Sequence, residues 1–375
     1  MDPAGFAPVC RELYSLAVLE RPEVCVSRGI HLGVRSERLL NTVFKCVRVR
    51  LLDVSGWERW NDRLVQRLAL CHRMGQFRCL RALLMRGCNE VSNSAVSGLL
   101  EALGGELRYL DLSDCAKLGF ACLPPTLVNL KVLLIGYQRK RGSIADGDLL
   151  AHIVGGRRLV APRLEWLSLQ NRLEVKSLRG IGRLAPTLRV LDLRGCSEIP
   201  ADEYTHCASL PRLEELYAGT ALTSEVLCNI AKGCPALRVL DVSGSDVSPD
   251  CVNAICSNLK ALEKLKLTKC TALTNQGVGR LLEALPALSL LDVSHCWKLS
   301  DSLANALPPI ASKGTNCTIH LYCSSRRVKL GGLQLLDRPH TPGNGDGGPA
   351  CPDIWCGSHF APPGVKCRPI SVEAP

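Results

Sequence analysis

The stretch LRVLDLRGC, residues 188–196, decides the fold of this chain because close copies of it recur along the sequence. The copies include LRYLDLSDC (107–115), LRVLDVSGS (237–245), LEKLKLTKC (262–270) and LSLLDVSHC (288–296). Within each copy the apolar fourth and sixth positions alternate with their neighbours, as in a short strand with one buried face. A helical pattern such as TNQGVGRLLEAL (274–285) follows the turn. Each unit therefore predicts a strand, a turn and a helix.

The units repeat at a nearly constant interval. Aligned on the first apolar position, they begin at Val49, Leu80, Leu107, Leu130, Leu164, Leu188, Leu213, Leu237, Leu262 and Leu288, with a degenerate last copy near Asn316. Most intervals lie near 25 residues, and such a period is the signature of a stacked solenoid. A single unit cannot bury its own apolar face, so neighbours must stack, with a parallel sheet on the inner curve and helices outside.

These repeats resemble the leucine-rich repeats of the cysteine-containing subtype, found in F-box/LRR substrate receptors and in related proteins without an F-box. The LxxLxLxxC phrase carries the resemblance, together with the helix starts LTSEVL (222–227) and LTNQGV (273–278) and the helix end IAKGCPALRVLDV (230–242). It implies an α/β leucine-rich-repeat solenoid of about eleven repeats over residues 46–330. Adaptor binding would need an F-box near the start, and its usual Leu-Pro opening is not found there.

The resemblance also gives many of the 21 cysteines a structural role. It places five of them in the turn after a strand, facing inward toward neighbouring backbone: Cys88, Cys115, Cys196, Cys270 and Cys296. Units with another residue there should be less regular: Trp57, Gln138, Arg172, Ala221 and Ser245. A second set near helix ends, Cys207, Cys234 and Cys256, should pack as small hydrophobes. One cysteine per repeat makes a ladder and not a four-ligand metal cluster.

Composition indicates an ordered protein with an aliphatic core, and the first residues indicate a location inside the cell. Hydrophobic residues make up 46% of the chain and aromatics only 4%, so Leu, Val, Ala and Cys must build the core. Apolar runs are broken by charge before 18 residues, and the first residues, MDPAGFAPVCRELY, lack the pattern of a secretory signal. We therefore expect no membrane span, reduced thiols, and a cytoplasmic or nuclear location.

Residues 138–163 depart from the period and form a basic insertion about nine residues longer than its neighbours. Its basic residues are Arg139, Lys140, Arg141, Arg157 and Arg158. The wider stretch 139–194 holds 12 Lys/Arg against 5 Asp/Glu. The insertion is interpreted as a solvated loop, with a nuclear-localisation or acidic-partner patch as the first alternative. A nucleic-acid site is less favoured, since basic clusters without interleaved aromatics cannot stack bases.

The two ends fall outside the repeats. Residues 1–45 contain plausible helices at 10–20 and 35–47 and should form a helical cap on the first repeat. Residues 331–375 are rich in Pro and Gly, and their composition predicts disorder. The tail holds Cys351, Cys356, His359 and Cys367, whose spacing matches no zinc module. We expect no bound metal.

No catalytic motif was found, so we expect neither an enzyme nor a cofactor. Phosphate-binding, dinucleotide, serine-hydrolase and HExxH signatures are all missing, and the eight histidines are scattered. Function should then lie on a surface. The third, fifth and seventh positions of each phrase should face the inner curve, while the fourth and sixth point into the core.

The inner curve is the predicted binding surface for another protein. It should carry Arg86, Tyr109, Trp166, Arg194, Tyr217, Lys264 and Lys266, because aromatic residues and Arg dominate binding interfaces. By resemblance, the protein would be a substrate-recognition or adaptor component of a ubiquitin-ligase system, with a cullin-type ligase adaptor among its partners. The alternative is a scaffold subunit of a larger, possibly ribonucleoprotein, assembly that uses the basic stretch 139–194.

Overall fold

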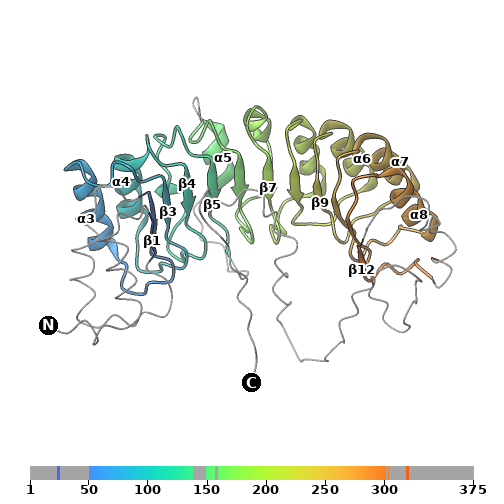
Figure 1. The fold of residues 1–375 in the computed structure, drawn as a ribbon, viewed down its shortest axis with the longest axis horizontal. Helices are drawn as coiled ribbons and strands as arrows, with labels where there is room; N and C mark the ends of the chain where they lie inside the picture. Colours follow the sequence, from blue (N-terminus) through green and yellow to red (C-terminus); the bar gives the residue numbers. More distant parts are fainter. Residues whose placement is uncertain are drawn as a thin grey trace, which may run out of the picture.

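A computed structural model of the chain describes residues 23–25, 50–137, 149–156, 159–300, 303 and 318–320. Twelve short strands pair in chain order into one parallel sheet that runs along an arc (Figure 1). The strands are β1 (Glu23–Cys25), β2 (Leu51–Asp53), β3 (Ala82–Leu84), β4 (Tyr109–Asp111), β5 (Val132–Leu134), β6 (Trp166–Ser168), β7 (Val190–Asp192), β8 (Glu215–Tyr217), β9 (Val239–Asp241), β10 (Lys264–Lys266), β11 (Leu290–Asp292) and β12 (Thr318–His320). The protein is an α/β leucine-rich-repeat solenoid, as predicted.

Helices and 3-10 turns connect the strands and lie on the outer side of the arc (Figure 1). The α-helices are α3 (Asp62–Arg73), α4 (Asn93–Leu103), α5 (Leu149–Gly155), α6 (Ser224–Gly233), α7 (Pro249–Asn258) and α8 (Asn275–Ala284). The predicted helix starts are confirmed: the Thr223 and Thr274 hydroxyls accept hydrogen bonds from the first turns of α6 and α8. Such N-caps satisfy amides that the helix itself leaves unpaired.

The strand register matches the alignment of the phrases. Leu191 pairs with Leu167 on one side and Leu216 on the other, so equivalent positions stack from repeat to repeat. Fourth-position leucines from β2 to β11 are all 2% exposed or less, and they form the centre of the core. Strand β12 corresponds to the degenerate last copy, whereas β1 adds a strand that the repeat pattern did not predict.

The turn after each strand is built from two recurring features. The eighth position adopts a left-handed backbone in eight described repeats, at Gly56, Gly87, Asp114, Asn171, Gly195, Gly244, Lys269 and His295. One position later, the buried cysteine donates its S–H to the sixth-position carbonyl of the preceding repeat, as from Cys196 to Leu169 at 3.0 Å and from Cys115 to Met85 at 3.0 Å. The inward role of the turn cysteines is confirmed.

Arg172 takes the turn position of the β6 repeat and makes the equivalent bond. Its Nε donates to the Ile135 carbonyl at 2.6 Å, while the side chain is 1% exposed. Strand β6 keeps its register with β5 and β7, so the expectation that this unit would be less regular is wrong for its strand. Units with Trp57, Ala221 or Ser245 at this position also keep the strand register. The turn of the Ala221 unit is less regular, as predicted, because its eighth residue, Thr220, does not adopt the left-handed backbone.

Three outer elements are 3-10 turns and not the predicted helices: η2 (Phe120–Cys122), η3 (Ile181–Leu184) and η4 (Ala201–Ser209). Pro124, Pro125 and Pro186 follow η2 and η3 within three residues, and proline disfavours the α conformation of the residue before it, so these elements stay short. Gly180 and Gly182 further weaken helix formation around η3.

The basic insertion is only partly a loop. Its second half contains α5, and Leu150, Ile153 and Val154 are buried in the core. These apolar residues have helical spacing, so this half supplies the outer element of the β5 repeat. The interpretation of 138–163 as a solvated loop is therefore wrong for α5. The expected helices at 10–20 and 35–47 and the tail 331–375 lie outside the described residues.

Candidate protein-interaction face

The solenoid brings five of the predicted contact residues onto neighbouring strands. Trp166, Arg194, Tyr217, Lys264 and Lys266 come from β6, the turn after β7, β8 and β10, and we call them the inner-face patch. The third-position row runs through Trp166, Val190, Glu215, Val239 and Lys264, as the pairing of β6 to β10 shows. Tyr109 on β4 and Arg86 after β3 lie farther along the sheet, outside this patch.

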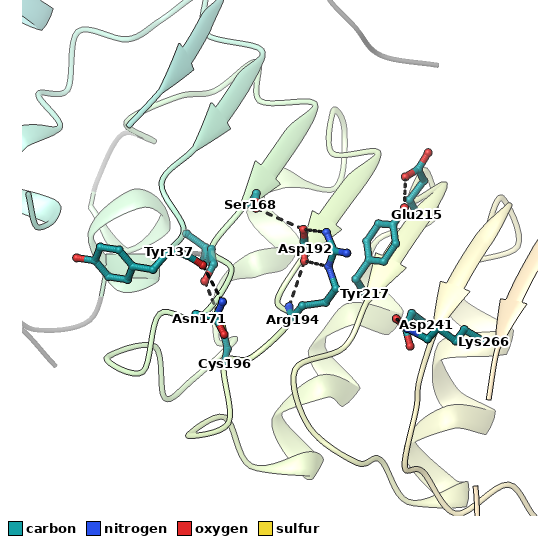
Figure 2. Close-up of polar contacts among 11 residues, drawn as sticks. Tyr137, Ser168, Asn171, Asp192, Arg194, Cys196, Glu215, Tyr217, Asp241 and Lys266 are labelled. Carbon is teal, nitrogen blue, oxygen red and sulfur yellow. Dashed lines mark hydrogen bonds and ion pairs between the residues drawn. The ribbon is translucent and has the colours of Figure 1, made fainter. Parts of the chain in front are cut away.

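Tyr217 is a buried support and not the exposed contact that the sequence predicted. Its side chain packs with Val190, Val239 and Trp166 in an apolar cluster separate from the main core, and Tyr217 is 3% exposed. Its hydroxyl donates a 2.7 Å hydrogen bond to Glu215 (Figure 2). A long aromatic side chain in the fifth-position row reaches the third-position row, so it fills space between strands.

Arg194 lies over this cluster in a fixed orientation. Its guanidinium carbon is 4.8 Å from the centre of the Tyr217 ring, within the range of a cation–π contact. Its Nε and Nη2 donate to Asp192 at 3.0 and 2.7 Å, and Ser168 donates to the same carboxylate at 3.5 Å (Figure 2). Bidentate pairing of this kind gives the guanidinium a defined geometry.

Fifth-position aspartates hold the turns and their neighbouring cations. Five of them accept a hydrogen bond from the amide two residues on: Asp53, Asp111, Asp192, Asp241 and Asp292. This is the geometry of an Asx-turn, which explains why aspartate recurs in the column. Asp241 also lies 3.4 Å from Lys266 (Figure 2), so the lysine is anchored to the strand beside it.

Two carboxyl groups on this face are shifted toward the neutral form. Burial raises the pKa of Glu215, opposed by the Tyr217 hydrogen bond and by the charges of Lys264 and Arg238. Burial likewise raises the pKa of Asp111, opposed by hydrogen bonds from Ser113. Desolvation disfavours the carboxylate form, so both groups hold a proton more tightly than an exposed carboxyl group does.

Trp166 is half-buried on β6 and packs against the Tyr217 cluster. Its Nε1 atom is buried, and it has no hydrogen-bond partner among the described residues. Buried indole N–H groups usually find an acceptor, because an unpaired donor is costly. The sequence identified Trp166 as one of the few aromatic residues of the chain and could not show this unpaired donor.

Sequence reasoning missed Trp297, which is 83% exposed in the turn after β11. It follows the turn cysteine Cys296, at a position that is polar or small in most repeats. A large apolar residue at that position was the available signal.

The predicted basic patch falls on residues that the structure does not describe. Arg139, Lys140, Arg141, Arg157 and Arg158 all lie outside the described residues. Several described cations of the stretch 139–194 serve the fold instead: Arg172 pairs with Glu174 at 2.9 Å, Arg189 with Glu214 at 3.3 Å, and Arg183 donates to the Gly156 carbonyl at 2.6 Å.

Over the described part of the chain, no three His, Cys, Asp or Glu side chains gather where they could hold a metal ion. The tail residues Cys351, Cys356, His359 and Cys367 lie outside it. None of the described helices has the length and apolarity needed to cross a membrane.

No protein-family model and no curated protein sequence match the chain. Solved structures do match its fold, among them the crystal structure of the Rad7 and Elc1 complex in yeast. A chain of that complex aligns with 19% identity and a TM-score of 0.54, over 80% of this chain and 71% of that chain. At this identity the likeness concerns the fold, and it agrees with a leucine-rich-repeat-like solenoid.

Proposed function

We propose that this protein is a non-catalytic interaction module whose inner face binds another protein. The observation that carries the proposal is a set of partly exposed aromatic and cationic side chains along the inner face from β6 to β10: Trp166, Arg194, Lys264 and Lys266. Tryptophan and arginine are the residues most often decisive at such interfaces.

The other charged groups of this face support binding better than catalysis. Asp192 and Asp241 are engaged by turn amides and by the cations Arg194 and Lys266. Glu215 is buried and hydrogen-bonded to Tyr217. These groups fix the shape of the surface, as expected of a preformed recognition site.

We further propose that the partner belongs to a ubiquitin-ligase system, with this chain as the substrate-recognition or adaptor component. Two observations support this: the repeats resemble those of F-box/LRR receptors, and the fold is similar to a chain of the Rad7 and Elc1 complex. The alternative, a ribonucleoprotein scaffold, has less support because Arg172, Arg183 and Arg189 are engaged within the fold.

Affinity purification of the full chain from its native cells, with and without RNase, tests this proposal. We expect the same proteins to be recovered in both cases, including a cullin-type adaptor subunit, and Trp166→Ala to reduce that recovery. The surface variant Arg280→Ala on α8 is the control and should leave it unchanged. Recovery that depends on RNA, with no ligase subunit present, would favour the scaffold.

A further inference from the structure

A second charged feature runs along the amino ends of the strands, away from the inner-face patch. The second positions of the phrases stack into a column, and its nine charged members form what we call the strand-start column: Arg50, Arg81, Arg108, Lys131, Glu165, Arg189, Glu214, Arg238 and Glu263. Backbone hydrogen bonds prove the adjacency, since each amide donates to the carbonyl of the previous member, as from Arg81 to Arg50 at 2.8 Å and from Arg108 to Arg81 at 2.8 Å.

From Lys131 onward the column alternates in sign. Its members form three ion pairs between adjacent repeats: Lys131 with Glu165 at 2.5 Å, Arg189 with Glu214 at 3.3 Å, and Arg238 with Glu263 at 2.6 Å. Opposite charges on neighbouring strands stabilise a sheet, and like charges destabilise it. Each charged side chain in this half of the column is therefore paired with an opposite charge on an adjacent repeat.

The first half lacks the acidic members. Arg50, Arg81 and Arg108 follow one another directly, on strands about 4.8 Å apart. Arg81 is paired with Glu106 at 2.6 Å, but the structure gives Arg50 and Arg108 no ion pair among the described residues, and both are exposed. Arg50 and Arg108 therefore place two exposed positive charges, without an ion pair among the described residues, at this end of the column, where an external anion can reach them.

We propose that Arg50 and Arg108, on either side of the Arg81–Glu106 pair, bind an acidic segment of a protein partner. Its carboxylates would take the places that Glu165, Glu214 and Glu263 hold in the second half of the column. The second half of the column shows that carboxylates fit these cations, because each of its three anions is a glutamate. A nucleic acid fits less well, since the three positions include no aromatic side chain on which bases could stack.

This inference is independent of the inner-face proposal, because the arginines lie at the strand starts and not on the inner-face patch. The test uses the full chain and a fluorescein-labelled peptide of alternating glutamate and glycine. An extended chain presents alternate residues on one side, which suits a column of cations. Binding is measured by fluorescence anisotropy, and it should weaken when salt is raised from about 0.05 to about 0.3 M.

The decisive variant is Arg108→Glu. It places a carboxylate between Arg81 and Lys131, so peptide binding should weaken roughly tenfold or more, as charge-assisted contacts are replaced by repulsion. The melting temperature should stay the same or rise, because like charges are removed from adjacent strands. A lower melting temperature would contradict the reasoning. Trp166→Ala should leave peptide binding unchanged, which separates this site from the inner-face patch.

Arg280→Glu is the matched control, with the same change of charge on the exposed surface of α8. Equal loss of binding in this control would show attraction to net charge alone and would overturn the proposal. A labelled short oligouridine provides the second comparison. If it binds more tightly than the peptide and is equally sensitive to Arg108→Glu, the site recognises a phosphate backbone and the assignment to an acidic protein segment is wrong.

Discussion

Replacing Arg172 with cysteine tests how the solenoid closes its turns. In the native chain the Arg172 guanidinium donates to the carbonyls of Ile135 and Leu118, pairs with Glu174 at 2.9 Å and stacks on Tyr137 at 4.1 Å. Cysteine is the residue that other repeats use at this position, and it could still donate to Ile135. It would leave Leu118 and Glu174 without their donor.

The expected cost follows from those two losses. Removing one member of a buried ion pair costs about 3–5 kcal/mol, and an unpaired buried carbonyl costs about 1–3 kcal/mol. The Glu174 side chain is 10% exposed, which lowers the first figure, and the bond from cysteine to Ile135 restores about 1 kcal/mol. We expect Arg172→Cys to lower the free energy of unfolding by about 3 kcal/mol. Adding Glu174→Gln should recover about 1–2 kcal/mol, because the unpaired charge is then gone.

Urea denaturation followed by circular dichroism measures both variants. Hydrogen exchange at β5 and β6 provides a local measure, which matters because repeat proteins can unfold in parts. Wild-type stability for Arg172→Cys, or no recovery in the double variant, would refute the assigned role of Arg172.

Three further results are expected. Leu191→Ala should cost about 2–5 kcal/mol in urea denaturation, because Leu191 is fully buried, and an unchanged midpoint would show that the strand register is wrong. Buried cysteines should be free thiols that react with an alkylating agent only after unfolding, because burial raises their pKa, as for Cys196, whose pKa is raised to about 12. Several disulfides in the intact mass would contradict the proposed intracellular location. Burial raises the pKa of Glu215, so the folded state binds this proton more tightly than the unfolded state. The free energy of unfolding should therefore fall as pH rises above the usual glutamate range, and Glu215→Gln should remove that part of the loss. A larger loss in Glu215→Gln than in the wild type would instead mean that the carboxylate stabilises the fold.

Much of the fold was predictable because the repeat phrase combines several signals. The spacing of Leu188, Leu191 and Leu193 predicted the strand and its buried face, and the nearly constant period predicted that the repeats stack on one another. The 3-10 turns were harder, because proline and glycine near η2 and η3 override a helical pattern only weakly marked in the sequence. The sequence showed that arginine takes the place of the turn cysteine at position 172. It could not show that this unit keeps a regular strand, because the guanidinium donates to carbonyls far away in the chain, such as that of Leu118.

The candidate site was predictable in its location and less so in its details. Strand alternation brought Trp166, Lys264 and Lys266 to one face as expected. It could not show that Tyr217 is buried, because the ring leaves its own row and packs on Val190 and Val239. The acidic partners of the strand-start column also emerge only once the repeats are stacked, since paired residues are 25 or more positions apart in sequence.

The central claim is that the inner face binds a protein, and the affinity of the most abundant purified partner for a Trp166→Ala/Lys264→Ala variant tests it most directly. Both side chains are partly exposed, whereas Tyr217 is buried and its truncation would confuse binding with folding. Isothermal titration calorimetry should show the dissociation constant rising about thirtyfold, which corresponds to about 2 kcal/mol, with Arg280→Ala unchanged. Normal binding by the folded double variant, together with loss of binding when Arg139, Lys140 and Arg141 are neutralised, would contradict the claim and assign the function to the insertion.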